Sequence, residues 1–408
     1  MNHATSFNRL LINLDKYLLQ KTQHDETGSG AVTPPSILVV SDENLQSELV
    51  YLKRLQGTVH VITNRFDLYS FCGDQDISAN FNDFDFISLP QNRYDIGIYR
   101  ISKERAVSHH VLNSLSEHIV ASGLILLGGK KNEGIKNYTD KCKSQLGMSG
   151  SLVKHGDFYI ASLTQANASL IEDKVQALLD DKDYTTCQEV PIKSNKEAAP
   201  HVFFSKPGLY GWDKIDRGSE FLIETLLSER DLCGTMNDAT SLNYLDLGCG
   251  YGFLSIMLLE RLIAKLLHST NAQDNAEPKI HLSATDNNAA AVAMCEHNLD
   301  AYIAKHSLAL SFEVSADDCG ATLSGKYEVI LCNPPFHQGF STEPELTEKF
   351  ITAAKRLISA SGRAYFVVNV FIPLERLAGK HFKKVTTLAN NQQFKVIELK
   401  HALNLGLM

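Results

Sequence analysis

Short apolar runs alternate with amphipathic stretches along both halves of this chain. The stretches between the runs, such as 44–55 and 254–266, have the three- and four-residue apolar spacing of helices. The runs themselves are short and rich in β-branched residues: 36–41 and 59–64 in the first half, and 242–247, 280–286 and 327–331 in the second. Strands that alternate with helices predict parallel sheets with helices on both faces. We therefore expect an α/β protein with two tandem doubly wound, Rossmann-like domains.

A polar segment separates the two patterned halves. We expect a first domain over 1–164, a connection over 165–200 with one helix at 169–179, and a second domain over 201–408. Near the end of the second domain, residues 385–398 predict a hairpin that closes the sheet with an antiparallel edge.

The last apolar run of the second half ends in the corner Asn333-Pro334-Pro335-Phe336. Pro334 biases Asn333 away from the α region, and neither proline has an N–H to donate. The Asn333 side-chain oxygen and the Pro334 carbonyl thus offer two acceptors for the hydrogens of a planar amino group, and Phe336 offers a flat face for the ring that carries it. The corner suits the amine of a nucleobase. A simple turn around a buried phenylalanine is the structural alternative.

Three glycines, Gly248, Gly250 and Gly252, follow the run 242–247 and precede a helical pattern. Glycines before a helix start let a ligand approach the backbone and favour negative charge. Their spacing differs from the Gly-x-Gly-x-x-Gly of dinucleotide sites, so NAD is the poorer fit. Asp246 precedes the first glycine by two residues, where its carboxylate can meet a cation such as the amino-acid end of S-adenosylmethionine.

Acids also end the next two predicted strands. Asp286 ends 280–286, where such sheets hold ribose hydroxyls, and Asp317 follows 312–316 and suits an adenine amine. The sequence therefore predicts that three strand ends meet at one crevice.

These motifs resemble those of class I methyltransferases that act on amines. More narrowly, Pro335-Phe336-His337, Asp216-x-Gly218-Ser219 ahead of the glycines and the extra domain in front resemble the bacterial small-subunit ribosomal RNA guanine-N2 methyltransferase C family. The resemblance covers nearly the whole chain, and the insert 269–278 departs from it. It implies guanine contacts from Asn333 to Phe336 and these contacts to S-adenosylmethionine: Asp216, Gly218, Asp246, Gly248, Gly250, Gly252, Asp286 and Asp317.

The first half resembles a degenerate copy of the second. Residues 94–100 align with 327–333, which places Arg100 where the second copy has Asn333. A guanidinium cannot accept a hydrogen bond from an amine, and Ser41-Asp42-Glu43-Asn44 obstructs the position of the glycines. We therefore expect this domain not to methylate. The resemblance to the family implies that it docks RNA or supports folding of its partner.

Net charge is −8, which does not favour RNA binding, because phosphate contacts need Lys and Arg. Local clusters of basic residues could still contact phosphates, and Lys130 and Lys131 belong to one such cluster. A solvated surface without RNA contacts is the alternative. The preceding glycines lack the spacing of a phosphate loop. For His337, base contact and a structural role are both open.

The composition also bears on membrane association, localisation and metal binding. No apolar segment approaches the roughly 20 residues of a membrane span, and the first residues lack a secretory signal, so we expect a cytoplasmic protein, which we expect to be monomeric. Eight scattered cysteines without a Cys-x-x-Cys pair predict neither a metal site nor disulfides.

Two rival functions stay open. One is methylation of another amine: guanine N2 in large-subunit ribosomal RNA, adenine N6, or a protein glutamine amide. The other is a non-enzymatic RNA-binding module for ribosome assembly.

Overall fold

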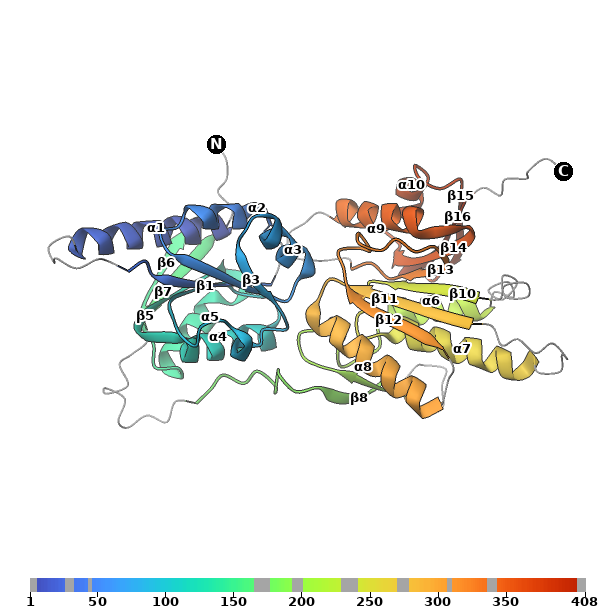
Figure 1. Ribbon diagram of the computed structural model, residues 1–408, viewed down its shortest axis with the longest axis horizontal. Coiled ribbons are helices and arrows are strands. Elements are labelled where there is room, and N and C mark those ends of the chain that lie inside the picture. Colours follow the sequence, from blue (N-terminus) through green and yellow to red (C-terminus); the bar gives the residue numbers. More distant parts are fainter. Residues whose placement is uncertain are drawn as a thin grey trace. The chain divides into compact units, whose positions relative to one another are not determined.

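The computed structural model describes residues 6–25, 33–42, 46–164, 177–192, 201–228, 241–269, 279–306, 310–335 and 343–401. The chain divides between Thr186 and Cys187 into two compact units, and each is built around a seven-stranded sheet (Figure 1). The expected α/β class with two tandem Rossmann-like domains is confirmed.

The first unit has the strand order β3-β2-β1-β4-β5-β7-β6, parallel except where β7 pairs with its neighbours. Its strands are β1 (Ser36–Ser41), β2 (Thr58–Thr63), β3 (Ser78–Phe81), β4 (Tyr94–Arg100), β5 (Ile119–Lys130), β6 (Ser149–His155) and β7 (Phe158–Thr164). Its helices are α1 (Ser6–Asp25), α2 (Gln46–Leu49), α3 (Phe66–Asp74), α4 (Arg105–His118) and α5 (Ile135–Ser144), with the 3₁₀ turns η1 (Val50–Arg54), η2 (Phe86–Ser88) and η3 (Lys131–Glu133).

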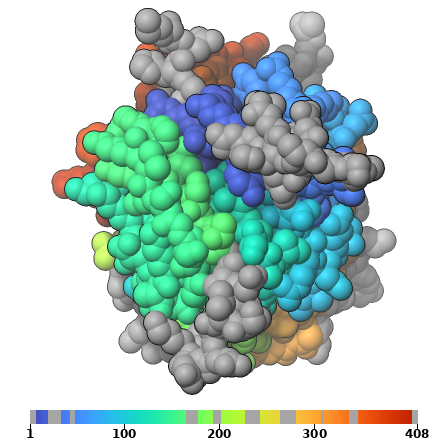
Figure 2. Space-filling model, turned by 90° about the vertical axis from the view of Figure 1, so that its left-hand side faces the viewer, coloured from blue at the N-terminus to red at the C-terminus, as the bar shows by residue number. Residues whose placement is uncertain are grey.

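Both faces of the first sheet are covered, which explains why β1 is apolar almost throughout. Helices α1 to α3 pack on one face, and α4 and α5 pack on the other. The start of the chain forms the amphipathic helix α1, whose Leu10, Leu14 and Leu18 belong to the core at four-residue spacing. In Figure 2 the first unit faces the viewer, and the green residues of the β6–β7 hairpin form one side of the visible surface.

Part of the expected connection 165–200 packs against the first unit. The Asn113 side chain on α4 donates to the Leu179 carbonyl and accepts from the Leu179 N–H, both at 2.9 Å. Tyr184 is buried and stacks on His110 with 4.6 Å between ring centroids. Residues 165–176, and with them most of the helix expected at 169–179, lie outside the described residues. Residues 177–179 are not helical.

The second unit has the order β12-β11-β10-β13-β14-β16-β15, with β16 antiparallel to both neighbours, as expected of its final hairpin. Its strands are β10 (Ser241–Leu247), β11 (Lys279–Asp286), β12 (Ser311–Ala316), β13 (Tyr327–Cys332), β14 (Ile358–Asn369), β15 (Lys384–Asn390) and β16 (Phe394–Lys400), with a separate pair of β8 (Gln188–Ile192) and β9 (His201–Ser205). Its helices are α6 (Arg217–Ser228), α7 (Phe253–Ser269), α8 (Ala289–His306), α9 (Glu343–Leu357) and α10 (Leu374–Ala378).

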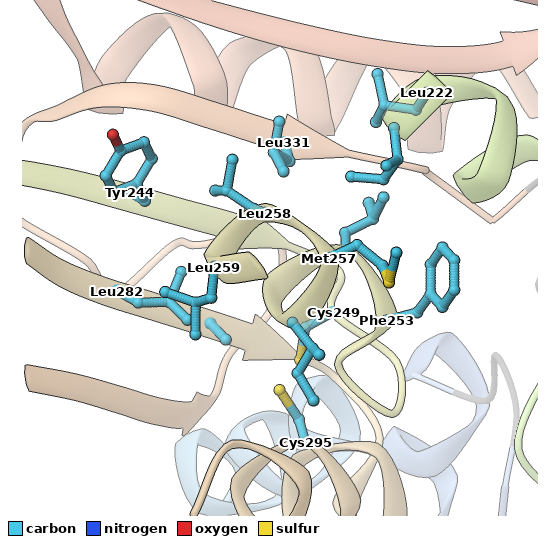
Figure 3. Packing of buried hydrophobic residues seen from close by; sticks show 14 of the residues in the cluster. Leu222, Tyr244, Cys249, Phe253, Met257, Leu258, Leu259, Leu282, Cys295 and Leu331 are labelled. Carbon is cyan, nitrogen blue, oxygen red and sulfur yellow. The ribbon is translucent and has the colours of Figure 1, made fainter. Parts of the chain in front are cut away.

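Two apolar clusters hold this sheet between its helices. One lies under α6, α7 and α8, where Met257 and Leu258 of α7 pack near Leu331 of β13 (Figure 3). The other joins the opposite face to α9 and α10. Because both faces of the sheet are packed, its strands are held in place, and so are the polar residues at their ends.

The two units share more than strand order. Asp95 of β4 accepts from the Ser36 N–H at the start of β1, and Glu328 of β13 accepts in the same way from the Asn243 N–H of β10, both at 2.8 Å. The pairs β4–β5 and β13–β14 also carry a register irregularity at the same place. These matches support an internal duplication.

A buried ion pair lies at the first unit's counterpart of the Asn333 corner. Arg100 ends β4, is 2% exposed, and donates from Nη2 to Glu133 Oε1 at 2.8 Å. Glu133 Oε2 also accepts from the Lys130 N–H at 2.7 Å. Arg100 therefore places at this position a guanidinium, which can donate hydrogen bonds but cannot accept one from an amine.

Replacing Glu133 by Gln should lower the free energy of unfolding of the first unit by about 1–3 kcal/mol, because a buried guanidinium loses its charged partner. Urea unfolding followed by circular dichroism measures this. The matched control is Asp157→Asn, because Asp157 forms an exposed pair with Lys130 and solvent screens such pairs, so this variant should lose little stability. Equal losses in both variants would contradict the structural role of the buried pair.

Candidate cofactor and nucleobase site

Polar residues lie at or next to the ends of four neighbouring parallel strands of the second unit, at one edge of the sheet. Asp246 of β10 pairs with Leu331 of β13 on one side and Ala284 of β11 on the other, and Asp286 of β11 pairs with Ala316 of β12. The glycine turn leaves β10 and the Asn-Pro-Pro corner leaves the adjacent β13 in the same direction. The structure thus brings the predicted strand-end residues together.

The glycine turn needs its glycines. Gly248, Gly250 and Gly252 have φ of +85°, +55° and +90°, a region that other residues rarely adopt. A Cβ on Gly252 would also lie 3.0 Å from Cys295 Sγ of α8. At Gly250 a Cβ would meet nothing within 4 Å, so this stretch of backbone is open to a ligand beside the N-terminus of α7.

Asp246 is buried beneath this turn with one oxygen satisfied and one not. Its Oδ2 accepts from the Ser255 N–H at 3.0 Å and from Ser255 Oγ at 2.7 Å. Among the described residues its Oδ1 has no hydrogen-bond partner. Burial, with a smaller contribution from the Asp286 charge, raises the pKa of Asp246 to about 7.

The next two acids support the turn and the strand ends. Asp286 accepts from the Gly250 N–H and the Asn288 N–H, each at 2.9 Å, and so ties the glycine turn to β11. Asp317 Oδ2 accepts from the Thr322 N–H at 3.0 Å and from its hydroxyl at 2.5 Å. Asp317 Oδ1 is buried without a partner in the described part of the chain.

Asn333 is similar to Asp246 in that, among the described residues, only one of its two side-chain polar atoms has hydrogen-bond partners. Its Nδ2 donates to Asp216 Oδ2 and, at 2.9 Å, to Ser219 Oγ. Its Oδ1 is buried, and no described residue donates to it. Pro334 is buried and Pro335 half-buried behind it. Phe336 and His337 lie outside the described residues.

Asp216, which the resemblance assigned to the cofactor, accepts a hydrogen bond from Asn333, and Gly218, assigned likewise, lies beside both side chains. Asp216 precedes α6, and its Oδ2 accepts from the Ser219 N–H at 2.8 Å, which is an N-cap. A Cβ on Gly218 would lie 3.3 Å from Asp216 Oδ2 and 3.4 Å from Asn333 Nδ2. The sequence reasoning did not assign roles to Ser219, Ser255 and Thr322. Of these, only Ser219 had a local signal, the Asp-x-x-Ser spacing of a capped helix start.

Lys130 and Lys131 belong to the first unit. Lys130 ends β5 and lies 3.4 Å from Asp157, and Lys131 begins η3 on the surface. The preceding Gly128 is a packing residue, since a Cβ there would lie 2.6 Å from Leu10 and 2.7 Å from Phe158. Within the described ranges, no three His, Cys, Asp or Glu side chains gather to hold a metal ion, and none of the helices is long and apolar enough to cross a membrane.

Residues 201–398 match the family described as Methyltransferase small domain. Two relatives named Ribosomal RNA small subunit methyltransferase C are similar: one from Shewanella pealeana is 24% identical, covering 74% of this chain and 76% of that protein, and one from Shewanella piezotolerans is 25% identical, covering 75% and 77%.

One solved structure is similar over almost the full length of this chain. It is the 16S rRNA N2 G1207 methyltransferase (RsmC) of T. thermophilus, in complex with AdoMet and guanosine. The TM-score is 0.65 at 20% identity, and the match covers 95% of this chain and 91% of that one. The shared feature is the two-domain fold.

Proposed function

We propose, from the match of residues 201–398 to the Methyltransferase small domain family, that this chain methylates the exocyclic N2 amine of a guanine in small-subunit (16S) ribosomal RNA. One observation carries the proposal. Asp246 Oδ1, Asp317 Oδ1 and Asn333 Oδ1 are buried acceptors without partners among the described residues, and all three lie at one edge of the sheet. Buried acceptors are usually satisfied, so three together indicate groups that a ligand completes.

The methyl donor is S-adenosylmethionine, which supplies a methyl group on a sulfonium sulfur. In the proposed assignment, Asp246 Oδ1 accepts from the ammonium of its amino-acid end, beside the open backbone of Gly250. Asp286 would accept hydrogen bonds from the ribose hydroxyls. These bonds would replace the one that it accepts from the Gly250 N–H. Asp317 Oδ1 would accept from the adenine amine.

Asn333 and Pro334 act on the guanine. The N2 lone pair is conjugated with the ring, so the nitrogen is a poor nucleophile until it moves toward tetrahedral geometry. Asn333 Oδ1 and the Pro334 carbonyl accept its two hydrogens and align it for in-line transfer. The same oxygens would stabilise the positive charge that develops on nitrogen as the N–C bond forms and the S–C bond of the donor breaks. The methylated nitrogen then loses one proton to water, so no strong base is needed. Pro335 stiffens the corner, and Phe336 would stack on a base that is single-stranded or flipped out.

The first unit would dock ribosomal RNA or support folding of the second, with Lys130 and Lys131 as candidate phosphate contacts. In the second domain, His337 is a candidate base contact. The proposed division is 1–164 for the degenerate domain, 165–200 for the connection and 201–408 for the catalytic domain. The proposed site of action is the cytoplasm, where the ribosomal RNA partner is found, and the proposed active form is a monomer.

Nucleoside mass spectrometry of a methylation reaction tests the function. Purified protein and isotopically labelled S-adenosylmethionine are incubated, in parallel reactions, with naked 16S ribosomal RNA, the small subunit or the large subunit. Labelled N2-methylguanosine should form in 16S RNA. Label in N6-methyladenosine, in large-subunit RNA or in protein glutamine would replace guanine N2 of 16S RNA as the target. Binding of RNA without label transfer to any acceptor would favour the ribosome-assembly module.

A further inference from the structure

We propose that Asp216 is a positioning residue that fixes the orientation of the Asn333 amide, so that Oδ1 and not Nδ2 faces the substrate amine. The inference rests on the proposed function, because it concerns the residue that acts on the amine. It replaces the cofactor contact that the sequence suggested for Asp216.

Orientation matters because the two ends of a carboxamide have nearly the same shape and opposite hydrogen-bonding roles. With Oδ1 toward the substrate, Asn333 accepts an N–H of the amine. If the amide rotated by half a turn, its own N–H groups would face those of the substrate, and neither side could accept. A catalytic asparagine at this corner therefore needs a group that distinguishes its two ends.

Asp216 distinguishes them because an ionised carboxylate only accepts hydrogen bonds. Its Oδ2 accepts from Asn333 Nδ2, and Ser219 Oγ accepts from the same nitrogen at 2.9 Å. Both hydrogens of Nδ2 are thus used on the side of α6. The opposite end of the amide, Oδ1, is buried with no donor among the described residues.

The local structure holds the carboxylate in this place. Asp216 caps α6 through the Ser219 N–H, and the Glu220 N–H donates to its carbonyl at 2.9 Å. The helix N-terminus favours a negative charge there. Gly218 leaves the space between the two side chains free, since a Cβ would lie within 3.4 Å of both.

The variant Asp216→Asn tests the inference with little change in shape. Asn caps helices as well as Asp does, so the unfolding temperature should stay close to that of the wild type. Its amide can donate to Asn333 Oδ1 and stabilise the rotated amide. We expect kcat in the labelled methylation reaction to fall about 100-fold, as when a group that stabilises the transition state is lost. The Kd of S-adenosylmethionine, from isothermal titration calorimetry, should be unchanged.

The double variant Asp216→Asn with Asn333→Asp provides the rescue. The amide introduced at position 216 then donates to one oxygen of the carboxylate introduced at position 333, and the other oxygen accepts from the substrate amine. We expect kcat about tenfold above that of Asp216→Asn, equivalent to 1.36 kcal/mol. Asn333→Asp alone places two carboxylates in contact and should stay slow. A weakened Kd for the cofactor in Asp216→Asn, or a double variant no faster than it, would overturn the inference.

The product that the wild-type protein forms distinguishes failure of the proposed substrate from failure of the proposed role of Asp216. If wild-type protein labels an amine other than guanine N2, the proposed substrate fails, while the ratios between variants on that amine still decide the role of Asp216. If wild-type protein labels guanine N2 and the ratios fail, the substrate stands and the positioning role is wrong.

Discussion

Replacing Asn333 by Ala should lower kcat for methyl transfer by about 10²–10³-fold, while the Kd of S-adenosylmethionine stays the same. The alanine removes the buried Oδ1 that accepts from the amine and leaves the Pro334 carbonyl alone. The expected loss falls on kcat because the nitrogen becomes positively charged only as the methyl group arrives. Single-turnover methylation with labelled donor and calorimetric titration of the donor measure the two quantities.

Asp317→Ala is the contrasting control, because it removes a buried acceptor at the far side of the same edge, on the cofactor side. It should weaken the Kd of the donor and spare kcat at saturating donor. Unchanged turnover in Asn333→Ala would remove Asn333 from the mechanism, and loss of donor binding in that variant would place it in the cofactor site.

The sequence was sufficient to predict the class of fold and the position of the strand-end residues. Apolar runs and glycines are local signals, and Gly248 and Gly252 lie with positive φ in the turn where the sequence predicted close approach of a ligand to the backbone. Because parallel strands deliver their carboxyl ends to one edge, Asp246 and Asn333 could be expected near each other without coordinates. Their chemical roles remain proposals.

The role of Asp216 could not be predicted in the same way. Its contact joins residues 117 apart in the sequence, and no periodicity encodes such a pair. Residues 177–186 also make contacts that join distant parts of the sequence. Their polar composition predicted part of the connection, and in the structure Leu179 and Tyr184 are buried, with Asn113 supplying both backbone hydrogen bonds of Leu179.

Asp246 illustrates how a ligand site can cost stability. Its ordinary pKa of 3.8 rises to about 7 in the folded protein, so the folded state binds the proton more tightly than the unfolded chain does. Stability should therefore decrease as pH rises from about 4 to about 7, and stay lower above that range. At 1.36 kcal/mol per pKa unit, the penalty above pH 7 is about 4 kcal/mol.

Replacing Asp246 by Asn should therefore stabilise the ligand-free protein at pH 8 while weakening donor binding. The variant removes a penalty of about 4 kcal/mol and introduces an unpartnered amide N–H that costs about 1–3 kcal/mol, so we expect a net gain of about 2 kcal/mol. Without the carboxylate, the Kd of S-adenosylmethionine should increase at least about tenfold, since one charge-assisted hydrogen bond contributes about 1.5–3 kcal/mol. Urea unfolding and calorimetric titration at pH 8 measure the two effects.

The pH dependence separates the effect of Asp246 from those of other groups. In the wild type, donor affinity should fall as pH decreases from 7 to 5, because protonation of Asp246 competes with the ammonium for Oδ1. In Asp246→Asn this part of the dependence should be absent, while contributions from the donor's own groups remain in both proteins. A variant that is destabilised at pH 8 and still binds the donor with wild-type affinity would mean that Asp246 serves the fold and not the cofactor.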